Sequence, residues 1–528
     1  MISEQADRFG DHLAIISQGR QVSYSKLHQR AQLLAAALAG KGIVRGDRIG
    51  VLIPNRIEWI ELCLAASGAG ATLVPFTTWS TRPELEFLLA DSDIKMLFAA
   101  ARFAERDFAA DLAALLPQYS PDDPQSRFPT LREVVLIDAA EGHGFTDFAD
   151  FARTELACVE PLPPRTAASA ADDGLILYTS GSSATPKAVR LKQYGIVENG
   201  FNIGERQGLL PGDRVLVAPP LFWSYGSANA LPATLSHGAT LVLQEKFEPG
   251  EAMDLIETHR CTALYTLPGM TQAMLRHPDF NRSRLSSLRT GLTIGSESEV
   301  VAAAEGLGIA EICNIYGATE TYGNCCVTWH HWPLAKRTAC QGPPLPGNEL
   351  RFVDLETGLP VAAGENGLVE VRGYVTVGYS GASAALTGAA ITPDGYYRTG
   401  DVGRLDADGN FVFVGRNTEM IKRAGINISP AEVEEILLKH PAVTEAAVVG
   451  VADAARGECV VAFVVQSKPG AVTAADLRGY CRDVASKYKI PDHIEVCEAL
   501  PTTATGKLQR RILKEIAAEV IAAPGLLP

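Results

Sequence analysis

Short apolar segments alternate with helix-like segments in the middle of the chain. Six apolar runs recur there: GLILYT (174–179), VLVAPP (215–220), ATLVLQ (239–244), ALYTLP (263–268), RTGLTIG (289–295) and EICNIYG (311–317). Segments with helical spacing lie between them, for example PGEAMDLIETHR at 249–260. Strands that alternate with helices predict a parallel sheet covered by helices on both faces. The first 170 residues show the same alternation less regularly, with RIGVLIP (48–54) before a helical pattern.

The sequence pattern changes after about residue 340, where Gly and Pro become frequent and the apolar runs shorten. The segments GNELRFVDLETGLPV, NGLVEVRG and GNFVFVG predict a small antiparallel region. A compact piece follows, with Ser429 as the N-cap of its first helix and an amphipathic helix at its end. We therefore predict an α/β fold. Its large N-terminal region (1–415) has parallel sheets plus a small β-region, and its smaller C-terminal domain (416–528) is a mobile α+β cap.

The composition is that of a globular protein and excludes several classes. The chain has 528 residues, too many for one hydrophobic core, since such cores stop growing at about 250–300 residues. The net charge is −14, which argues against a protein that coats nucleic acid. The N-terminus has neither the basic nor the apolar region of a secretory signal. The uncharged stretches 62–81 and 215–244 contain Gly, Pro, Ser and Thr, which indicates buried strands and loops, so we expect no membrane span.

The ten cysteines are scattered along the chain. Cys325 and Cys326 are adjacent, and no C-x-x-C pair exists. In a chain of this length, such cysteines are typical of reduced core thiols in a cytoplasmic protein. His330 and His331 are neighbours and cannot share a helix face, so a zinc site is not expected.

The first segment with candidate chemistry is YTSGSSATPK, residues 178–187, which follows a predicted strand. Its small side chains leave backbone N–H groups accessible, its hydroxyls add donors, and Lys187 adds a positive charge. Such a loop can bind phosphate oxygens. It is not a Walker A loop, because Pro186 rather than Gly precedes the lysine. An ordinary polar turn is the alternative.

Three further segments carry candidate chemistry. NIYGATET (314–321) follows a predicted strand, where open α/β sheets bind ligands; its carboxylate can hold Mg²⁺ and its tyrosine can stack on a base. In YRTGD (397–401), Asp401 can accept two hydrogen bonds from a ribose diol, and Arg416 can add a contact. PTTATGK (501–507) ends in a lysine. Taken singly, each of these also fits a surface turn or a solvated charge.

The chain resembles the adenylate-forming (AMP-binding) superfamily, which includes acyl-CoA synthetases, nonribosomal-peptide adenylation domains and luciferases. The resemblance rests on five motifs in family order: YTSGSSATPK, NIYGATE, YRTGD, GRNTEMIKRAGINISPAEVEEIL and PTTATGK. It covers essentially the whole chain. It implies ATP, Mg²⁺ and coenzyme A as cofactor and co-substrates.

The resemblance also implies roles for individual residues. Lys507, Thr319 and Glu320 would be catalytic: Lys507 would bridge the carboxylate and the α-phosphate, Thr319 would contact phosphate, and Glu320 would bind Mg²⁺. The implied cofactor-binding residues are Thr179, Ser180, Gly181, Ser182, Ser183, Thr185 and Lys187 around the triphosphate, Asn314, Tyr316 and Gly317 around adenine, Asp401 at the ribose, Arg416 near the hinge, and Ala424 and Gly425 in the stretch that delivers the phosphopantetheine thiol.

Three positions depart from the family pattern. The hinge, usually Asp or Lys, is Thr418. The motif PLFHxxG has Trp223 in place of His, and the stretch that often reads GAAP begins with Gly295 and Ser296. The last two normally border the acyl pocket or adenine, so Trp223, Gly295 and Ser296 are candidate substrate residues. Trp223 favours a shaped apolar or aromatic acid, with a core tryptophan as the alternative.

The resemblance implies an ATP-dependent carboxylic acid–CoA ligase in fatty-acid or aromatic-acid metabolism. It would form an acyl-adenylate, then an acyl-CoA thioester, releasing pyrophosphate and AMP. Two alternatives stay open: a ligase that loads a carrier protein, and a nucleotide-binding homologue without catalysis. Lys187, Glu320, Asp401 and Lys507 argue against the second. The sequence names neither the acid nor the oligomeric state.

Overall fold

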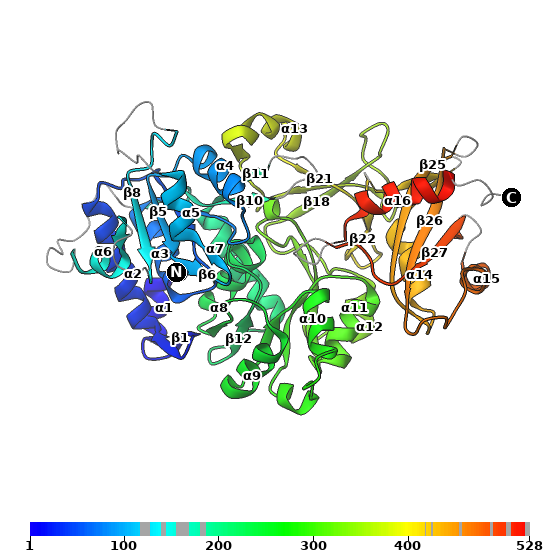
Figure 1. Cartoon of the computed structure of the whole chain (residues 1–528), viewed down its shortest axis with the longest axis horizontal. Helices are drawn as coiled ribbons and strands as arrows, with labels where there is room; N and C mark the ends of the chain where they lie inside the picture. Colours follow the sequence, from blue (N-terminus) through cyan, green and yellow to red (C-terminus); the bar gives the residue numbers. More distant parts are fainter. Residues whose placement is uncertain are drawn as a thin grey trace.

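The structure is a computed structural model that describes residues 1–116, 127–138, 144–154, 168–179, 186–417, 419–423, 426–453, 457–485, 489–502 and 508–522. Two eight-stranded sheets and the helices that pack on them form its larger part (Figure 1). We call the first sheet the one with the order β20-β11-β10-β4-β3-β5-β8-β9. Its strands are β3 (Arg48–Leu52), β4 (Thr72–Pro75), β5 (Met96–Ala100), β8 (Glu133–Ile137), β9 (Thr146–Asp147), β10 (Asp173–Thr179), β11 (Lys187–Lys192) and β20 (Tyr379–Ser380).

The second sheet has the order β17-β16-β15-β14-β12-β13-β1-β2. Its strands are β1 (Leu13–Ser17), β2 (Arg20–Ser23), β12 (Arg214–Val217), β13 (Thr240–Leu243), β14 (Ala263–Tyr265), β15 (Thr290–Thr293), β16 (Glu311–Tyr316) and β17 (Cys326–Val327). β12 to β16 pair in parallel, as the alternating pattern predicts. The run 174–179 is also a strand, but β10 lies in the first sheet instead of the second, parallel to β4 and antiparallel to β11. Buried strands of the two sheets have the same kind of apolar sequence, so the sequence does not show which sheet a strand joins. Long-range packing decides its partner.

Helices separate and cover the two sheets, so the larger part of the molecule has five layers. The helices between the sheets are α2 (Tyr24–Gly40), α3 (Ile57–Ala69), α7 (Gln193–Gln207) and α8 (Leu231–Ser236), which share one core cluster with both sheets. α4 (Arg82–Ser92) and α5 (Phe108–Leu115) pack on the outer face of the first sheet. α9 (Pro249–His259), α10 (Pro268–Leu275) and α11 (Glu297–Val301) lie on the outer side of the second sheet, and each contributes at least one buried side chain to the core on that side. The remaining short helices of this part are α1 (Ile2–Phe9), α6 (Phe148–Thr154), α12 (Leu334–Ala339) and α13 (Thr387–Ala390).

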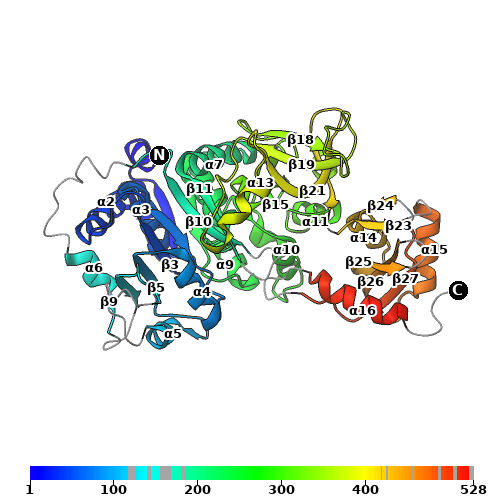
Figure 2. The same ribbon diagram turned by 90° about the horizontal axis from the view of Figure 1, so that it is seen from above.

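Two smaller sheets follow, and they are antiparallel except for one strand pair. The third sheet contains β18 (Glu349–Val353), β19 (Gly367–Arg372), β21 (Tyr397–Leu405) and β22 (Phe411–Arg416). The fourth contains β23 (Ile421–Arg423), β24 (Ile426–Ile428), β25 (Val443–Asp453), β26 (Gly457–Gln466) and β27 (His493–Cys497), with helices α14 (Pro430–Leu438), α15 (Ala474–Val484) and α16 (Arg510–Ala522). β27 joins β26 in parallel. Figure 2 shows the fourth sheet and its helices at the end of the molecule away from the N-terminus. The chain changes sheets between 417 and 420; the boundary at 415–416 stays a prediction.

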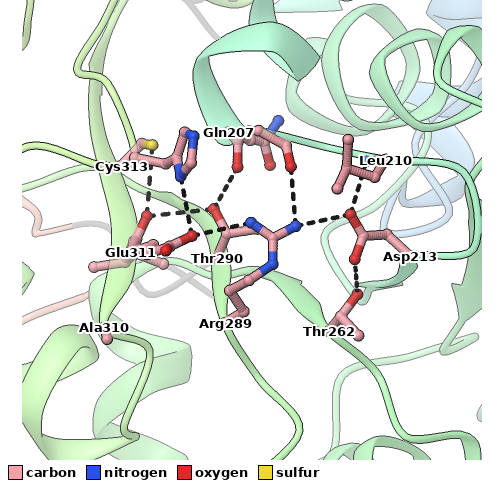
Figure 3. Close-up of polar contacts among 12 residues, drawn as sticks. Gln207, Leu210, Asp213, Thr262, Arg289, Thr290, Ala310, Glu311 and Cys313 are labelled. Carbon is pink, nitrogen blue, oxygen red and sulfur yellow. Dashed lines mark hydrogen bonds and ion pairs between the residues drawn. The ribbon is translucent and has the colours of Figure 1, made fainter.

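A polar network joins the amino ends of the parallel strands in the second sheet (Figure 3). The Arg289 guanidinium donates to Glu311 at 2.9 Å and to Asp213 at 2.8 Å, and Asp213 accepts from the Thr262 hydroxyl at 2.7 Å. Since these residues stand at the starts of β12, β14, β15 and β16, the network fixes the register of the sheet at the end opposite the candidate site. No helix in the described part of the chain is long and apolar enough to cross a membrane.

Candidate functional site

The predicted site residues gather where the carboxyl ends of β10 and β16 come together. β16 ends at Tyr316 and runs into a short 3₁₀ turn, Thr319–Thr321. β10 ends at Thr179, whose register partner is Lys187, the first residue of β11. β20 pairs with β11 and brings Tyr379 beside this edge. Strands of both large sheets therefore contribute to one region, as expected for ligand sites at the carboxyl ends of parallel strands.

Glu320 is a buried carboxylate with a tyrosine donor. Its side chain is 7% exposed, and its Oε1 accepts a hydrogen bond from the Tyr379 hydroxyl at 3.0 Å. Burial and the charge of Glu320 raise the pKa of Tyr379, so the phenol stays protonated and donates. Tyr397 is also buried beside the pair, and burial followed by the charge of Glu320 raises its pKa. The Lys187 ammonium lies 5.6 Å from the centre of the Tyr379 ring.

The chemistry of this group fits Mg²⁺. A carboxylate oxygen is a hard ligand, and Mg²⁺ is usually held by one or two carboxylates together with substrate phosphates. Across the described ranges, no cluster of three or more His, Cys, Asp or Glu side chains could hold a metal by itself. Glu320, with Lys187 close by, is therefore suited to a cation that arrives with a polyphosphate.

Asp401 forms the second polar centre, on β21. It is 3% exposed; its Oδ2 accepts from the Tyr316 hydroxyl at 2.7 Å, and its Oδ1 forms an ion pair with Arg416 Nε at 2.9 Å. Burial raises the pKa of Asp401, while Arg416 and the Tyr316 hydrogen bond act in the opposite direction. The Arg416 side chain is 57% exposed, so it can leave the carboxylate when a ligand hydroxyl replaces it.

The Tyr316 ring belongs to an aromatic cluster. Its centroid lies 4.3 Å from that of Phe411 and 6.0 Å from that of Phe413. Asn314, two residues earlier on β16, is fully buried and donates its amide to the Cys340 carbonyl at 3.2 Å. Gly317 lies so close to another segment that an added Cβ would stand 2.3 Å from the Gly323 carbonyl oxygen. Asn314 and Gly317 thus have structural contacts that explain their residue types.

Trp223 lies in an aromatic group near the same strand ends. Its ring meets Trp79 edge to face at 5.1 Å, and Trp79 also meets Phe222 at 5.0 Å. Trp79 is 42% exposed, and it follows β4 of the first sheet, whereas Trp223 follows β12 of the second. The next residue, Ser224, shares a hydrogen bond of 3.1 Å with the Thr319 hydroxyl. This bond links the aromatic group directly to the turn that carries Glu320.

Gly295 and Ser296 directly precede α11. Ser296 is the N-cap, and both its backbone N–H and its hydroxyl donate to Glu299 Oε2, at 2.7 and 2.9 Å. An added Cβ at Gly295 would lie 2.4 Å from the same oxygen. The closely packed cap explains the glycine, and the two residues follow β15, next to β16 in the sheet.

Several predicted residues lie outside the described part of the chain. These are Ser180, Gly181, Ser182, Ser183 and Thr185 of the first motif, together with Thr418, Ala424, Gly425 and Lys507. Their roles stay predictions. Conversely, sequence reasoning missed Tyr379 and Trp79, because nothing near either residue marks it and only the sheet topology brings it to the site.

Family models match both parts of the chain. Residues 2–380 match the AMP-binding enzyme family, and residues 432–507 match the AMP-binding enzyme C-terminal domain. The chain is 30% identical over 542 residues to the mitochondrial medium-chain acyl-CoA ligase ACSF2 of Mus musculus, covering 97% of this chain and 86% of that protein.

Solved structures share the whole fold. The crystal structure of ATP-bound MatB from Rhodopseudomonas palustris has a TM-score of 0.84 and 25% identity, covering 98% of this chain and 99% of that one. The anthranilate CoA ligase AuaEII in complex with anthranoyl-AMP also has a TM-score of 0.84, with 26% identity over 99% of this chain and 97% of that one. From its family models and its full-length likeness to these ligases, the chain belongs to the AMP-binding enzymes, the adenylate-forming superfamily of acyl-CoA synthetases and ligases.

Proposed function

We propose that the protein is an ATP-dependent carboxylic acid–CoA ligase. It would form an acyl-adenylate and then an acyl-CoA thioester, with release of pyrophosphate and AMP. The observation that carries this proposal is the meeting of Glu320, Lys187, Tyr316 and Asp401 at the joined strand ends. Together they offer a carboxylate for Mg²⁺, a cation for phosphate, an aromatic ring for a base, and an acceptor for a ribose.

In the first half-reaction, a carboxylate oxygen of the acid attacks the α-phosphorus of ATP. The bond from this phosphorus to the bridging oxygen breaks, and pyrophosphate leaves. Because two anions approach each other, the residues that surround them must neutralise charge in the transition state. Lys187 and Lys507 would supply positive charge, and Thr319 a hydroxyl donor. Mg²⁺, held by Glu320, would supply further neutralisation when bound.

Within the nucleotide site, the chain itself would select adenosine. The nearly buried Tyr316 ring and its neighbour Phe413 would border the base, and Asp401 would accept from the ribose hydroxyls after Arg416 moves away. Asp401 must be ionised for this. Its partner Tyr316 favours the ionised form by donating a hydrogen bond.

In the second half-reaction, the CoA sulfur attacks the acyl carbon, the bond to the AMP oxygen breaks, and AMP leaves. We propose that residues 416–528 rotate about Thr418 between the two steps, so that Ala424 and Gly425 replace Lys507 at the site. Two of the ion pairs that join the two parts are exposed and weak, which supports such a movement. Lys439 Nζ lies 3.9 Å from Glu297, and Arg276 lies 3.7 Å from Glu445, all on exposed side chains.

We infer that the acid is apolar, either fatty or aromatic. Trp79, Phe222 and Trp223 form an aromatic wall whose members come from both sheets, and Ser224 connects it to Thr319. Among the lining candidates, neither Trp223 nor the Gly295–Ser296 cap offers a cation for a second carboxylate. ACSF2 is named a medium-chain ligase and AuaEII an anthranilate ligase, and both kinds of acid are largely apolar.

The test is ATP–pyrophosphate exchange over a panel of fatty, aromatic and dicarboxylic acids, followed by thioester assays with CoA and with a phosphopantetheinylated carrier protein. We expect exchange with an apolar acid and transfer to CoA. Transfer to the carrier protein alone would support the alternative ligase, and ATP binding without exchange on any acid would indicate a non-catalytic homologue. We place the enzyme in the cytoplasm, in keeping with its scattered cysteines, a distribution typical of reduced core thiols.

A further inference from the structure

Tyr379 lies far from the other site residues in sequence, and strand pairing holds it in place. Tyr379 is the register partner of Val189 where β20 pairs with β11. Its backbone N–H donates to the Thr387 hydroxyl at 3.0 Å. Three residues earlier, the Thr376 N–H donates to the Glu320 carbonyl at 2.6 Å, and the Thr376 hydroxyl donates to the Arg190 carbonyl at 2.8 Å. The segment 376–379 therefore touches both Glu320 and β11 at several points.

The Tyr379 side chain makes two different contacts with charged groups. Its hydroxyl donates to Glu320 Oε1, and its ring face lies under the Lys187 ammonium at 5.6 Å. A cation over a ring face is attracted by the ring quadrupole, and a phenol that donates to a carboxylate fixes the direction of that carboxylate. The rigid Tyr379 side chain thus sets the position of the Glu320 carboxylate relative to the Lys187 ammonium.

We propose that Tyr379 is a positioning residue, which aims the Glu320 carboxylate at the Mg²⁺ of Mg·ATP and keeps Lys187 in register with it. The inference rests on the proposed function, in which Glu320 holds Mg²⁺. Residues that donate to a metal-ligating carboxylate fix its orientation, and changing them typically costs about 10–100-fold in metal affinity or activity. Tyr379 itself touches neither metal nor substrate in this role.

The distinguishing variant is Tyr379→Phe, which keeps the ring under Lys187 and removes only the hydroxyl. We expect the free Mg²⁺ concentration for half-maximal ATP–pyrophosphate exchange to rise by about 10-fold or more, with most of the maximal rate recovered at saturating Mg²⁺. A second readout needs no turnover. Binding of mant-ATP, followed by fluorescence, should be unchanged in EDTA, while the gain in affinity on adding Mg²⁺ should shrink.

Tyr396→Phe is the matched control. The Tyr396 hydroxyl donates to Glu349 Oε1 at 2.5 Å, a contact within the third sheet that does not involve Glu320. This variant should keep the wild-type Mg²⁺ dependence. A wild-type Mg²⁺ dependence in Tyr379→Phe as well would overturn the inference, as would an equal loss of mant-ATP affinity with and without Mg²⁺, because that would indicate general damage to the nucleotide site.

Glu320→Gln separates this inference from the proposed function. If Glu320→Gln leaves the Mg²⁺ dependence unchanged, Glu320 does not hold the ion and that part of the proposed function fails. If Glu320→Gln raises the requirement and Tyr379→Phe does not, only the inference fails. In the double variant, the hydroxyl should have no carboxylate left to orient, so adding Tyr379→Phe to Glu320→Gln should raise the Mg²⁺ requirement no further.

Discussion

The hydrogen bond from Tyr316 to Asp401 can be tested with a single-atom change. Tyr316→Phe removes the hydroxyl that donates to Asp401 Oδ2 at 2.7 Å and keeps the ring that packs on Phe411. Asp401 then stays buried with only the Arg416 ion pair. Since the lost bond favours the ionised carboxylate, the variant should raise the pKa of Asp401 further above its usual range.

The magnitude follows from the kind of bond that is lost. A hydrogen bond to a charged group contributes about 2 kcal/mol, so Tyr316→Phe should destabilise the native state by about that amount near neutral pH. The same free energy corresponds to a shift of about 1.5 pH units in the pKa of Asp401. The pH dependence of stability has a definite sign. The hydrogen bond from Tyr316 favours the ionised form of Asp401. The difference in stability between variant and wild type should therefore be largest at neutral pH, and it should shrink as the pH falls through the raised pKa of Asp401 and the carboxylate becomes protonated.

The assay is the pH dependence of kcat/KM for ATP in pyrophosphate exchange, together with urea unfolding at several pH values. We expect the acid limb of the variant to move to higher pH. Tyr265→Phe is the control, because the Tyr265 hydroxyl is equally buried but bonds only to the neutral side chains of Asn229 and Gln207. It should cost about 1 kcal/mol without moving the acid limb. An unshifted limb in Tyr316→Phe, or an equal shift in Tyr265→Phe, would refute the reasoning.

Three further predictions concern the remaining parts of the site. Lys507→Ala should slow acid-dependent pyrophosphate release by about 10²–10³-fold but convert supplied acyl-AMP and CoA to thioester at a near wild-type rate; equal loss in both half-reactions would contradict its assigned role. Thr418→Pro should impair the thioester step more than adenylation, because proline fixes φ at the proposed hinge, and equal impairment would count against a hinge there. Trp223→Ala should open the wall shared with Trp79 and shift preference towards bulkier apolar acids at unchanged ATP affinity, as measured by kcat/KM over the acid panel. An unchanged preference combined with a large loss of stability would instead identify Trp223 as a core residue.

Local signals predict the elements of this fold well. The Ser429 cap, the run 311–317 and the spacing of 249–260 correspond to the start of α14, to β16 and to α9. Sheet membership was harder to predict. β1 and β2 come first in the chain yet complete the second sheet beside β13, while β10 and β11 complete the first. The sequence of a short apolar strand does not indicate its partner, so only long-range packing decides which sheet the strand joins.

The candidate site likewise contains residues that sequence motifs indicate and residues that only the assembled fold brings to it. Glu320 and Asp401 stand in motifs whose residue types already indicate their chemistry, and both prove to be buried and hydrogen-bonded. Tyr379 and Trp79 stand in segments with no such signal. Their importance comes from where β20 and the end of β4 lie in the assembled first sheet. Residues that position others are, for this reason, the part of a site that sequence patterns reveal least.

Some strands that pair in one sheet lie far apart in the sequence, so the order in which the chain is synthesised matters for its folding. β1 leaves the ribosome first, but its parallel partner β13 is synthesised more than 200 residues later. At about 5–20 residues per second, Arg416 likewise follows Lys187 by roughly 10–50 s. During that interval Glu320, Tyr379 and Asp401 are added in turn, so the nucleotide site stays incomplete until Arg416 has been synthesised. ATP can therefore assist only the last stage of folding, and the apolar faces of the early strands must be protected by the growing chain itself or by chaperones.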